Sequence, residues 1–598
     1  MEPPINPSTL TADEDESIYG DDMIEEIEDD DEEMFEDDDD EEFAIEEGYV
    51  PHPYGVKPQG NYYFDSFKDD FTNTRYNGLG LFSGFEDHMI LDWMDLLTPK
   101  ELSVMAQVSK AFYLFVQEEE QWKLLTIRDF AKTFKYSHSW QYTYKCAATA
   151  GNVDGKTIVV PSPLKVEYFY SDYLFHIWRC SSIDVERWVE GETIDRRSNM
   201  TIGQFRQEYL IPNKPVILTD AMDAWKAKEW TRESLAEFSG DTPFYINSGV
   251  FMTMKEYFAY AAQTTEENPM YLFDHYYGEN RPEMLDMYSQ EKYFDEDFFN
   301  VLGDKRPSYR WLLAGPKRSG ATFHKDPNHT SAWNGVITGR KKWVMYPPHV
   351  VPPGVHPSDD GLEVTTPHSI VEWFINYYDT DVKSVLNQDK KDRRQQQQQQ
   401  LLSINGPNKK VERLNKNSKK NRIGGGSNRV GPQQKSKQQQ QTESTTTIDG
   451  SDYKPLECIL NPGELIFVPC GWWHCVLNME ESIAITHNFI NSNNILKVID
   501  FMATKKSKDL HNTFIQKFED AHPGKLQQIK NEQIERELKK KKVSIWDKID
   551  PNNNNDIEKE SKIENNNNNN NNSNSDTTTT PTPKKTGGFS FNFSISSD

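Results

Sequence analysis

The sequence predicts an α+β protein that is mainly β. It also predicts helices that flank the β domain, a small helical module that precedes it in the chain, and long unfolded segments. Short runs rich in aromatic and β-branched residues recur between residues 180 and 500, which is typical of strands. Apolar residues at helical spacing gather between residues 80 and 130. Only 36% of the 598 residues are hydrophobic, so part of the chain cannot bury enough surface to fold.

Residues 1–50 form the first unfolded segment. They contain 24 Asp or Glu and no Lys or Arg, against a net charge of −29 for the whole chain. We therefore predict an acidic disordered tail that serves mainly for solvation, with attraction of basic partners as the alternative. The five cysteines are odd in number and form no CxxC pair, which argues against a disulfide scaffold or a zinc site. No apolar stretch is long enough to cross a bilayer, so we expect no membrane role.

Residues 80–130 predict a module of short helices. Within 85–125, Thr98 precedes Pro99, and Glu101 follows at the third helical position. This pattern predicts a capping box at the start of a helix. The apolar positions with helical spacing are Met89, Ile90, Trp93, Met94, Leu97, Leu102, Met105 and Val108.

Residues 180–500 predict the mainly β domain. Helical patterns at 203–237 lie among its first strands, and residues 456–490 follow the pattern strand, turn at Pro462-Gly463, strand, turn, strand. We predict a helical segment at 501–548 and a disordered Asn/Thr-rich tail at 549–598. The earlier predicted strands are 214–220, 244–247, 270–274, 309–315 and 341–347.

A low-complexity insert at 384–450 interrupts this domain, and we predict that it is disordered. From Lys390 to Lys437 it has 14 Lys or Arg and 2 Asp or Glu. Such a basic stretch could make weak, salt-sensitive contacts with RNA phosphates, although it lacks interleaved aromatic residues. The alternative is a plain solvated loop.

His324, Asp326 and His474 are the candidate metal ligands. Residues two apart in a strand face the same side, so His324 and Asp326 can meet one metal. His474 lies at the start of another predicted strand, in PCGWWHCVLN. Two histidines and one carboxylate on one face leave coordination positions open, as in the facial triad of non-haem Fe(II) oxygenases. An HxD pattern alone is weak evidence, and His275, His329 and His487 are rival histidines.

A second set of residues strengthens the metal prediction. Lys341 shares a strand face with Trp343, where it could pair with the far carboxylate of a dicarboxylic co-substrate. Asn334, Thr486 and Tyr271 could add hydrogen bonds. Taken singly, Lys341 is more simply a solvent-facing lysine, Asn334 a turn residue and Tyr271 a core residue. Together with the triad they predict a co-substrate site.

Two long segments, RWLLAGPKRSGATFHKDPNHTSAWNGVITGRKKWVMYP and ECILNPGELIFVPCGWWHCVLN, resemble the JmjC oxygenases. The similarity is greatest to the phosphatidylserine-receptor-like (Jumonji-domain protein six) group. It implies a double-stranded β-helix (cupin or jelly-roll) barrel. It also implies Fe(II) held by His324, Asp326 and His474. Tyr271, Asn334, Lys341 and Thr486 match the residues that bind 2-oxoglutarate, and Ala321 replaces a threonine of close relatives.

The resemblance further implies a dioxygenase that acts on protein side chains. Its activity would be lysyl hydroxylation or demethylation of arginine or lysine, in histones or RNA-associated proteins. A homodimer would form through the C-terminal helices. We expect a nuclear chromatin regulator, with a cytoplasmic pool as an alternative.

Residues 85–125 resemble an F-box, which implies a Skp-type adaptor of a ubiquitin ligase as partner. A plain helical hairpin on the barrel is the alternative. The rival function for the whole chain is a substrate adaptor with a non-catalytic barrel.

Overall fold

The computed structural model describes residues 58–547 except for 68–70, 150–163, 165, 248, 359–360, 362, 389–390, 392–453 and 505–507. All of these described residues belong to one compact unit, Gly48–Asp598. The predicted tails at 1–50 and 549–598 and almost all of the predicted insert lie outside the described residues. The first residues of that insert, 384–388, are helical, so the prediction that it begins at 384 is wrong. The buried Leu386 explains why the helix continues there.

The N-terminal module is helical, as predicted. The Thr98 hydroxyl accepts a hydrogen bond from the Glu101 backbone, and the Glu101 carboxylate accepts one from the Thr98 backbone. Ile90, Met94 and Leu102 are buried, whereas Met89 and Val108 are exposed and do not belong to the core. The helices are α2 (Tyr62–Asp65), α3 (Thr74–Leu79), η1 (Gly80–Gly84), α4 (Asp87–Met94), α5 (Pro99–Met105), α6 (Lys110–Val116), α7 (Glu119–Phe130), α8 (Trp140–Thr149) and α9 (Asp172–Ser182).

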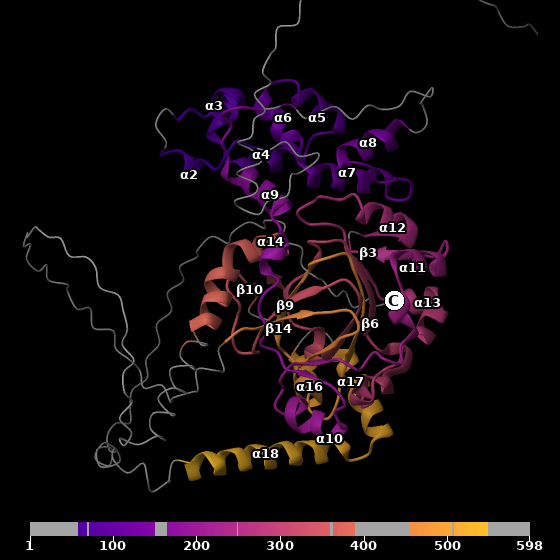
Figure 1. The fold of residues 1–598 in the computed structure, drawn as a ribbon. Coiled ribbons are helices and arrows are strands. Elements are labelled where there is room, and N and C mark those ends of the chain that lie inside the picture. Colours follow the sequence, from indigo (N-terminus) through magenta and orange to yellow (C-terminus); the bar gives the residue numbers. More distant parts are fainter. Residues whose placement is uncertain are drawn as a thin grey trace, which may run out of the picture. The chain divides into compact units, whose positions relative to one another are not determined.

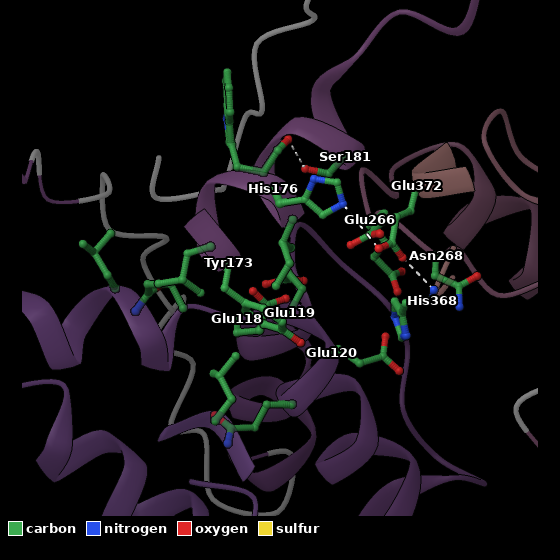
Figure 2. A pocket seen from close by; sticks show the side chains of 18 of the residues that line it. Glu118, Glu119, Glu120, Tyr173, His176, Ser181, Glu266, Asn268, His368 and Glu372 are labelled. Atoms are coloured by element: carbon green, nitrogen blue, oxygen red, sulfur yellow. Dashed lines mark hydrogen bonds and ion pairs between the residues drawn. The ribbon is translucent and has the colours of Figure 1, made fainter. Parts of the chain in front are cut away.

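The module contacts the β domain, which follows it in the chain, through a buried lysine. Lys123 on α7 is 3.0 Å from Glu266 and donates to the Asn268 carbonyl at 3.0 Å. A cavity of about 260 Å³ lies beside this contact, and several carboxylates line it together with apolar side chains (Figure 2). Burial raises the pKa values of Glu119 and Glu267 to about 8. Protons on these carboxyl groups therefore reduce the repulsion across the contact near neutral pH.

Two main sheets form the β domain, together with one two-stranded sheet, β10-β11, and the strands of the main sheets lie in the centre of Figure 1. The larger has the order β1-β2-β13-β8-β15-β6-β5-β3-β4, and the smaller has the order β12-β9-β14-β7. The strands are β1 (Arg196–Arg197), β2 (Val216–Leu218), β3 (Pro243–Ile246), β4 (Val250–Thr253), β5 (Leu272–Asp274), β6 (Arg310–Gly315), β7 (Gly320–His324), β8 (Ser331–Thr338), β9 (Lys341–Tyr346), β10 (His356–Pro357), β11 (Val364–Thr365), β12 (Leu456–Leu460), β13 (Leu465–Val468), β14 (Trp473–Asn478) and β15 (Ser482–Phe489).

Each strand run predicted before residue 350 contains a strand. Residues 456–490 form four strands where the sequence predicts three. The chain turns both between β13 and β14 and between β14 and β15, and all four runs are apolar enough to be buried. An apolar cluster lies on the inner faces of both sheets, with Trp311, Trp343, Val468 and Val476 among its members. The candidate site lies among these inward-facing side chains.

The segments on either side of the insert meet at a buried ion pair. Lys342 on β9 is 0% exposed, and its Nζ lies 2.7 Å from Glu457 on β12, which follows the insert. Tyr378, on η9 before the insert, donates to the same Glu457 carboxylate at 2.7 Å. The chain therefore leaves and re-enters the domain at neighbouring points, so a long insertion there costs little closure entropy.

Further helices cover the sheets. In the C-terminal segment, Phe514 and Phe518 pack on Phe298 and Phe299. The described helices include none that is long and apolar enough to span a bilayer. These elements are η2 (Val185–Trp188), α10 (Ile202–Phe205), η3 (Arg206–Leu210), η4 (Lys226–Glu229), α11 (Arg232–Ser239), α12 (Met254–Ala261), α13 (Tyr277–Asn280), η5 (Pro282–Met287), η6 (Lys292–Phe294), η7 (Phe298–Lys305), η8 (Pro327–His329), α14 (Ile370–Trp373), η9 (Phe374–Lys383), α16 (Ile495–Thr504), α17 (Lys508–Ala521) and α18 (Lys525–Asp547).

Candidate metal centre

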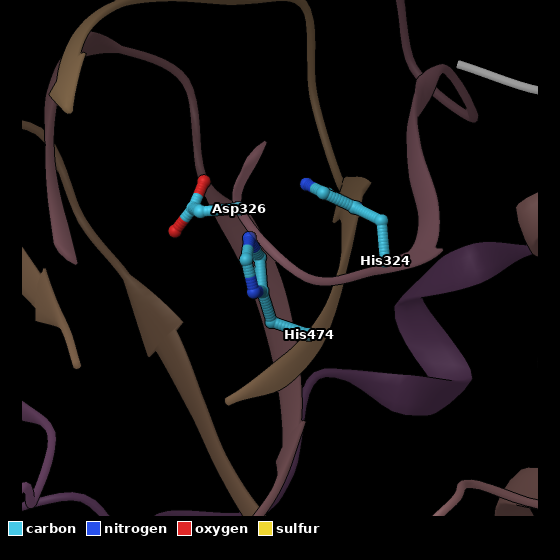
Figure 3. Close-up of side chains that lie close together, drawn as sticks. All are labelled: His324, Asp326 and His474. Carbon is cyan, nitrogen blue, oxygen red and sulfur yellow. The ribbon is translucent and has the colours of Figure 1, made fainter. Parts of the chain in front are cut away.

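The three predicted metal ligands meet at one end of the smaller sheet (Figure 3). β7 and β14 pair antiparallel, with His324 directly opposite His474 and their ring centroids 4.2 Å apart. One ligand atom each from His324, Asp326 and His474 lie within 4.8 Å of one another. Among the described residues, no other group of His, Cys, Asp and Glu meets this criterion.

Asp326 reaches the cluster differently from the prediction. β7 ends at His324, and Asp326 lies beyond it, before the tight turn η8. Pro327 follows directly and lacks the backbone N–H that a continuing strand needs. The extended backbone of Asp326 (φ −57°, ψ 143°) still carries its side chain to the side of His324. The shared face was predicted correctly, but the strand was predicted too long.

Both histidine rings are in the neutral form that can donate a lone pair to a metal ion. Burial lowers the pKa values of His324 and His474 to about 4, so the rings are neutral at pH 7. Nδ1 of His324 lies 2.8 Å from the Thr322 carbonyl, and Nδ1 of His474 lies 3.1 Å from the Trp472 carbonyl. A carbonyl only accepts, so each Nδ1 carries the proton and each Nε2 has the lone pair that a metal requires.

The four predicted co-substrate residues line the same cavity as the triad: Tyr271, Asn334, Lys341 and Thr486. The interpretation of Lys341 as a solvent-facing lysine is wrong, because its side chain is 1% exposed. Burial lowers its pKa to about 7. Its Nζ donates to the Tyr271 hydroxyl at 3.2 Å, and none of the ion pairs among the described residues includes it.

This cavity has the polar groups that an anionic co-substrate needs. Lys341 is a buried cation without a described carboxylate partner, and burying an unpaired charge is costly. Oδ1 of Asn334 also lacks a partner among the described residues. The two histidines and the carboxylate form the donor set that favours non-haem Fe(II) with open positions. The residues present therefore fit both iron and a dicarboxylate.

Sequence reasoning missed one polar residue of the cavity, Asn488. Its Nδ2 donates to Asp326 at 3.3 Å. The strand period could have revealed it, because Asn488 lies two residues after Thr486 on β15 and shares its face. Ala321 also lines the cavity, opposite Val476, so the missing threonine side chain affects the cavity wall and no metal ligand.

The rival histidines take other positions. The ring of His329 packs on Phe501 at 4.8 Å, and that of His275 on Tyr276 at 3.8 Å. His487 stacks on Trp333 and shares a hydrogen bond with Tyr288 at 2.8 Å. These three rings are therefore not part of the cluster of ligand atoms.

A cupin-like fold with this donor set and cavity defines an Fe(II)- and 2-oxoglutarate-dependent oxygenase. Residues 203–495 match the model of the cupin-like domain. The chain belongs to the cupin-like JmjC oxygenases.

Three relatives illustrate the similarity to this family. The chain is 36% identical over 523 residues to the arginine-specific demethylase JMJ22 of Arabidopsis thaliana, covering 84% of this chain and 89% of the relative. It is 29% identical over 347 residues to the bifunctional arginine demethylase and lysyl-hydroxylase psr-1 of Caenorhabditis elegans, covering 56% and 70%. It is 26% identical over 348 residues to the 2-oxoglutarate and iron-dependent oxygenase JMJD4 of Danio rerio, covering 54% and 64%.

Proposed function

We propose that His324, Asp326 and His474 hold the iron and that Tyr271, Asn334, Lys341 and Thr486 bind 2-oxoglutarate. The observation that carries this proposal is the meeting of all seven side chains around one cavity. When bound, iron and 2-oxoglutarate together activate dioxygen to oxidise a substrate C–H bond.

The chain's own residues would bind, orient and shield this reaction. The Lys341 ammonium, held by the Tyr271 hydroxyl, would pair with the far carboxylate of 2-oxoglutarate. The Thr486 hydroxyl donates to the Trp333 carbonyl at 2.8 Å, and it would turn to donate its hydrogen to that carboxylate, which only accepts. Trp311, Leu313 and Trp343 line the cavity and would exclude water from the reacting atoms.

The substrate we propose is a protein side chain in a nuclear protein, such as a histone or an RNA-associated protein. The names of two relatives describe an arginine demethylase and a bifunctional arginine demethylase and lysyl-hydroxylase. Both reactions begin with oxidation of an aliphatic C–H bond. Oxidation of a lysine side chain gives a stable alcohol, whereas oxidation of an N-methyl group gives a product that loses formaldehyde.

Mass spectrometry of trapped proteins would distinguish these reactions. A His324→Ala chain would be used to capture substrates, and wild-type chain, Fe(II) and 2-oxoglutarate would then be added. A gain of one oxygen on a captured protein is expected for hydroxylation, and the loss of a methyl group for demethylation. The control is wild-type chain without 2-oxoglutarate. Captured proteins that never change mass, despite succinate release, would contradict a protein substrate.

We propose a second function for the N-terminal module, as a docking site for a Skp-type ubiquitin-ligase adaptor. The observation in favour is a set of exposed apolar side chains on η1 and in the turns after α4 and α5, with Leu81 97%, Leu96 81% and Val108 59% exposed. Leu96→Asp is expected to abolish co-purification of such an adaptor. Ile534→Glu, at an exposed apolar position outside the module, is the matched control. Equal binding by both variants would contradict the proposal.

We also propose that α18 forms part of a homodimer interface. Ile534 and Leu538 are 58% and 53% exposed and lie one helical turn apart, so they share a face. Light scattering after gel filtration is expected to give a dimer for wild type and for the control Leu96→Asp. The double variant Ile534→Glu, Leu538→Glu is expected to be a monomer. A dimeric double variant would exclude this face.

A further inference from the structure

The buried asparagine Asn488 contacts the carboxylate of Asp326 and the turn that follows it. Asn488 is 5% exposed and lies on β15. Its Nδ2 donates to Asp326 Oδ1 at 3.3 Å and to Thr330 Oγ1 at 2.9 Å. A primary amide nitrogen has two hydrogens, so these two bonds use both of them.

The turn between these two acceptors has an unusual backbone. Asn328 and His329 both have positive φ, 55° and 54°. An asparagine tolerates this conformation, whereas the left-handed region is sterically unfavourable for the bulkier side chain of His329. A strained conformation persists only where the surroundings fix it. Here the ring of His329 packs on Phe501, and Thr330 is tied to both Pro327 and Asn488.

The donor and the acceptor of each hydrogen bond around this turn can be assigned. The Thr330 hydroxyl donates its hydrogen to the Pro327 carbonyl at 2.8 Å. It can therefore only accept from Asn488, so the nitrogen of the amide, not its oxygen, must face the turn. The same nitrogen then faces Asp326, and its bond favours the charged carboxylate, opposing the effect of burial on the Asp326 pKa.

We propose that Asn488 is a positioning residue that fixes the rotation of the Asp326 carboxylate, so that one oxygen is held by the amide and the other faces the metal. Without this bond the carboxylate could rotate about its side-chain torsion, which is broad for aspartate. The two histidines need no such help, because backbone carbonyls already orient their rings. For Asp326, the contact that can fix its orientation comes from another side chain, Asn488.

This inference rests on the proposed metal site, and the test separates the two. Co(II) would be titrated into the full-length chain, and its affinity and visible absorption measured for wild type and for His324→Ala, Asn488→Leu, Asn488→Ala and Thr330→Val. If wild type fails to bind Co(II), or His324→Ala binds as tightly, the proposed metal site itself is wrong.

With the metal site intact, Asn488→Leu, which keeps the branched side-chain shape but cannot donate, is expected to bind Co(II) about 10- to 100-fold more weakly, as outer-shell changes typically do. Its absorption band should also shift. Thr330→Val loses the turn contact but keeps the Asp326 contact, and is expected to bind with near wild-type affinity. The Tm of the metal-free chains checks folding, and the leucine variant covers the case in which the alanine variant does not fold. Wild-type affinity and spectrum in Asn488→Leu, or an equal loss in Thr330→Val, would overturn the inference.

Discussion

Replacing His324 with alanine is expected to lower iron-dependent succinate release by more than about 100-fold, beyond the 10- to 100-fold typical of changes outside the ligand set. The remaining ligands, Asp326 and His474, would leave the metal weakly held. Asp326→Ala is expected to have the same effect. Succinate release and iron content of the purified chain are the measurements.

The matched control for this prediction is His329→Ala. His329 lies in the turn η8, shortly after His324 in the chain, but its ring packs on Phe501 and not with the triad. It is expected to keep its iron and its activity. Iron-dependent turnover retained in His324→Ala, or lost equally in the control, would contradict the assignment. A wild-type chain that shows no turnover with added iron and 2-oxoglutarate would instead favour the non-catalytic adaptor.

Lys341→Met is expected to weaken 2-oxoglutarate binding by about 3 kcal/mol, or roughly a hundredfold, because it removes the buried cation that would pair with the far carboxylate. The chain itself should remain folded, because Lys341 has no described carboxylate partner to leave unpaired. Calorimetric titration of 2-oxoglutarate into the Mn(II)-loaded chain would measure this loss.

The neighbouring lysine on β9 provides the control. Lys342→Met would leave Glu457 buried without its cation, which is expected to cost about 3–5 kcal/mol of unfolding free energy. Its Tm should fall, while the 2-oxoglutarate affinity of the folded fraction should not change. Loss of affinity in Lys342→Met at low temperature, or a fully stable Lys342→Met, would contradict the different roles given to these two residues.

The pKa of Lys341 gives the same prediction a pH dependence. Without co-substrate its pKa is about 7, and a bound dicarboxylate would raise it. Affinity for 2-oxoglutarate should therefore be full below pH 7 and fall as the pH rises above 7, because binding must then include uptake of a proton. Lys341→Arg stays charged throughout, so its affinity should not show this fall.

Most of the secondary structure was predictable because it depends on local patterns. Thr98, Pro99 and Glu101 specify a helix start by contacts within a few residues, and the capping box is present. Alternation on β9 separated Lys341 from Lys342, and the two side chains do face different surroundings. Apart from the strand missed within 456–490, the errors lie at the ends of elements: β7 stops before Asp326, and the helix beyond η9 continues to 388. Such boundaries depend on a proline or on a buried side chain, which the periodicity does not report.

The sequence by itself determined which side chains are available to the site: two histidines, an aspartate, a lysine and their polar neighbours, placed on or beside strands of known period. The tertiary structure decided that His474 lies opposite His324, that Lys341 is buried without a carboxylate partner in the described part of the chain, and that Asn488 contacts Asp326. These facts depend on the register between strands far apart in the chain. That register is set by packing of the two sheets, and no local pattern in the sequence contains it.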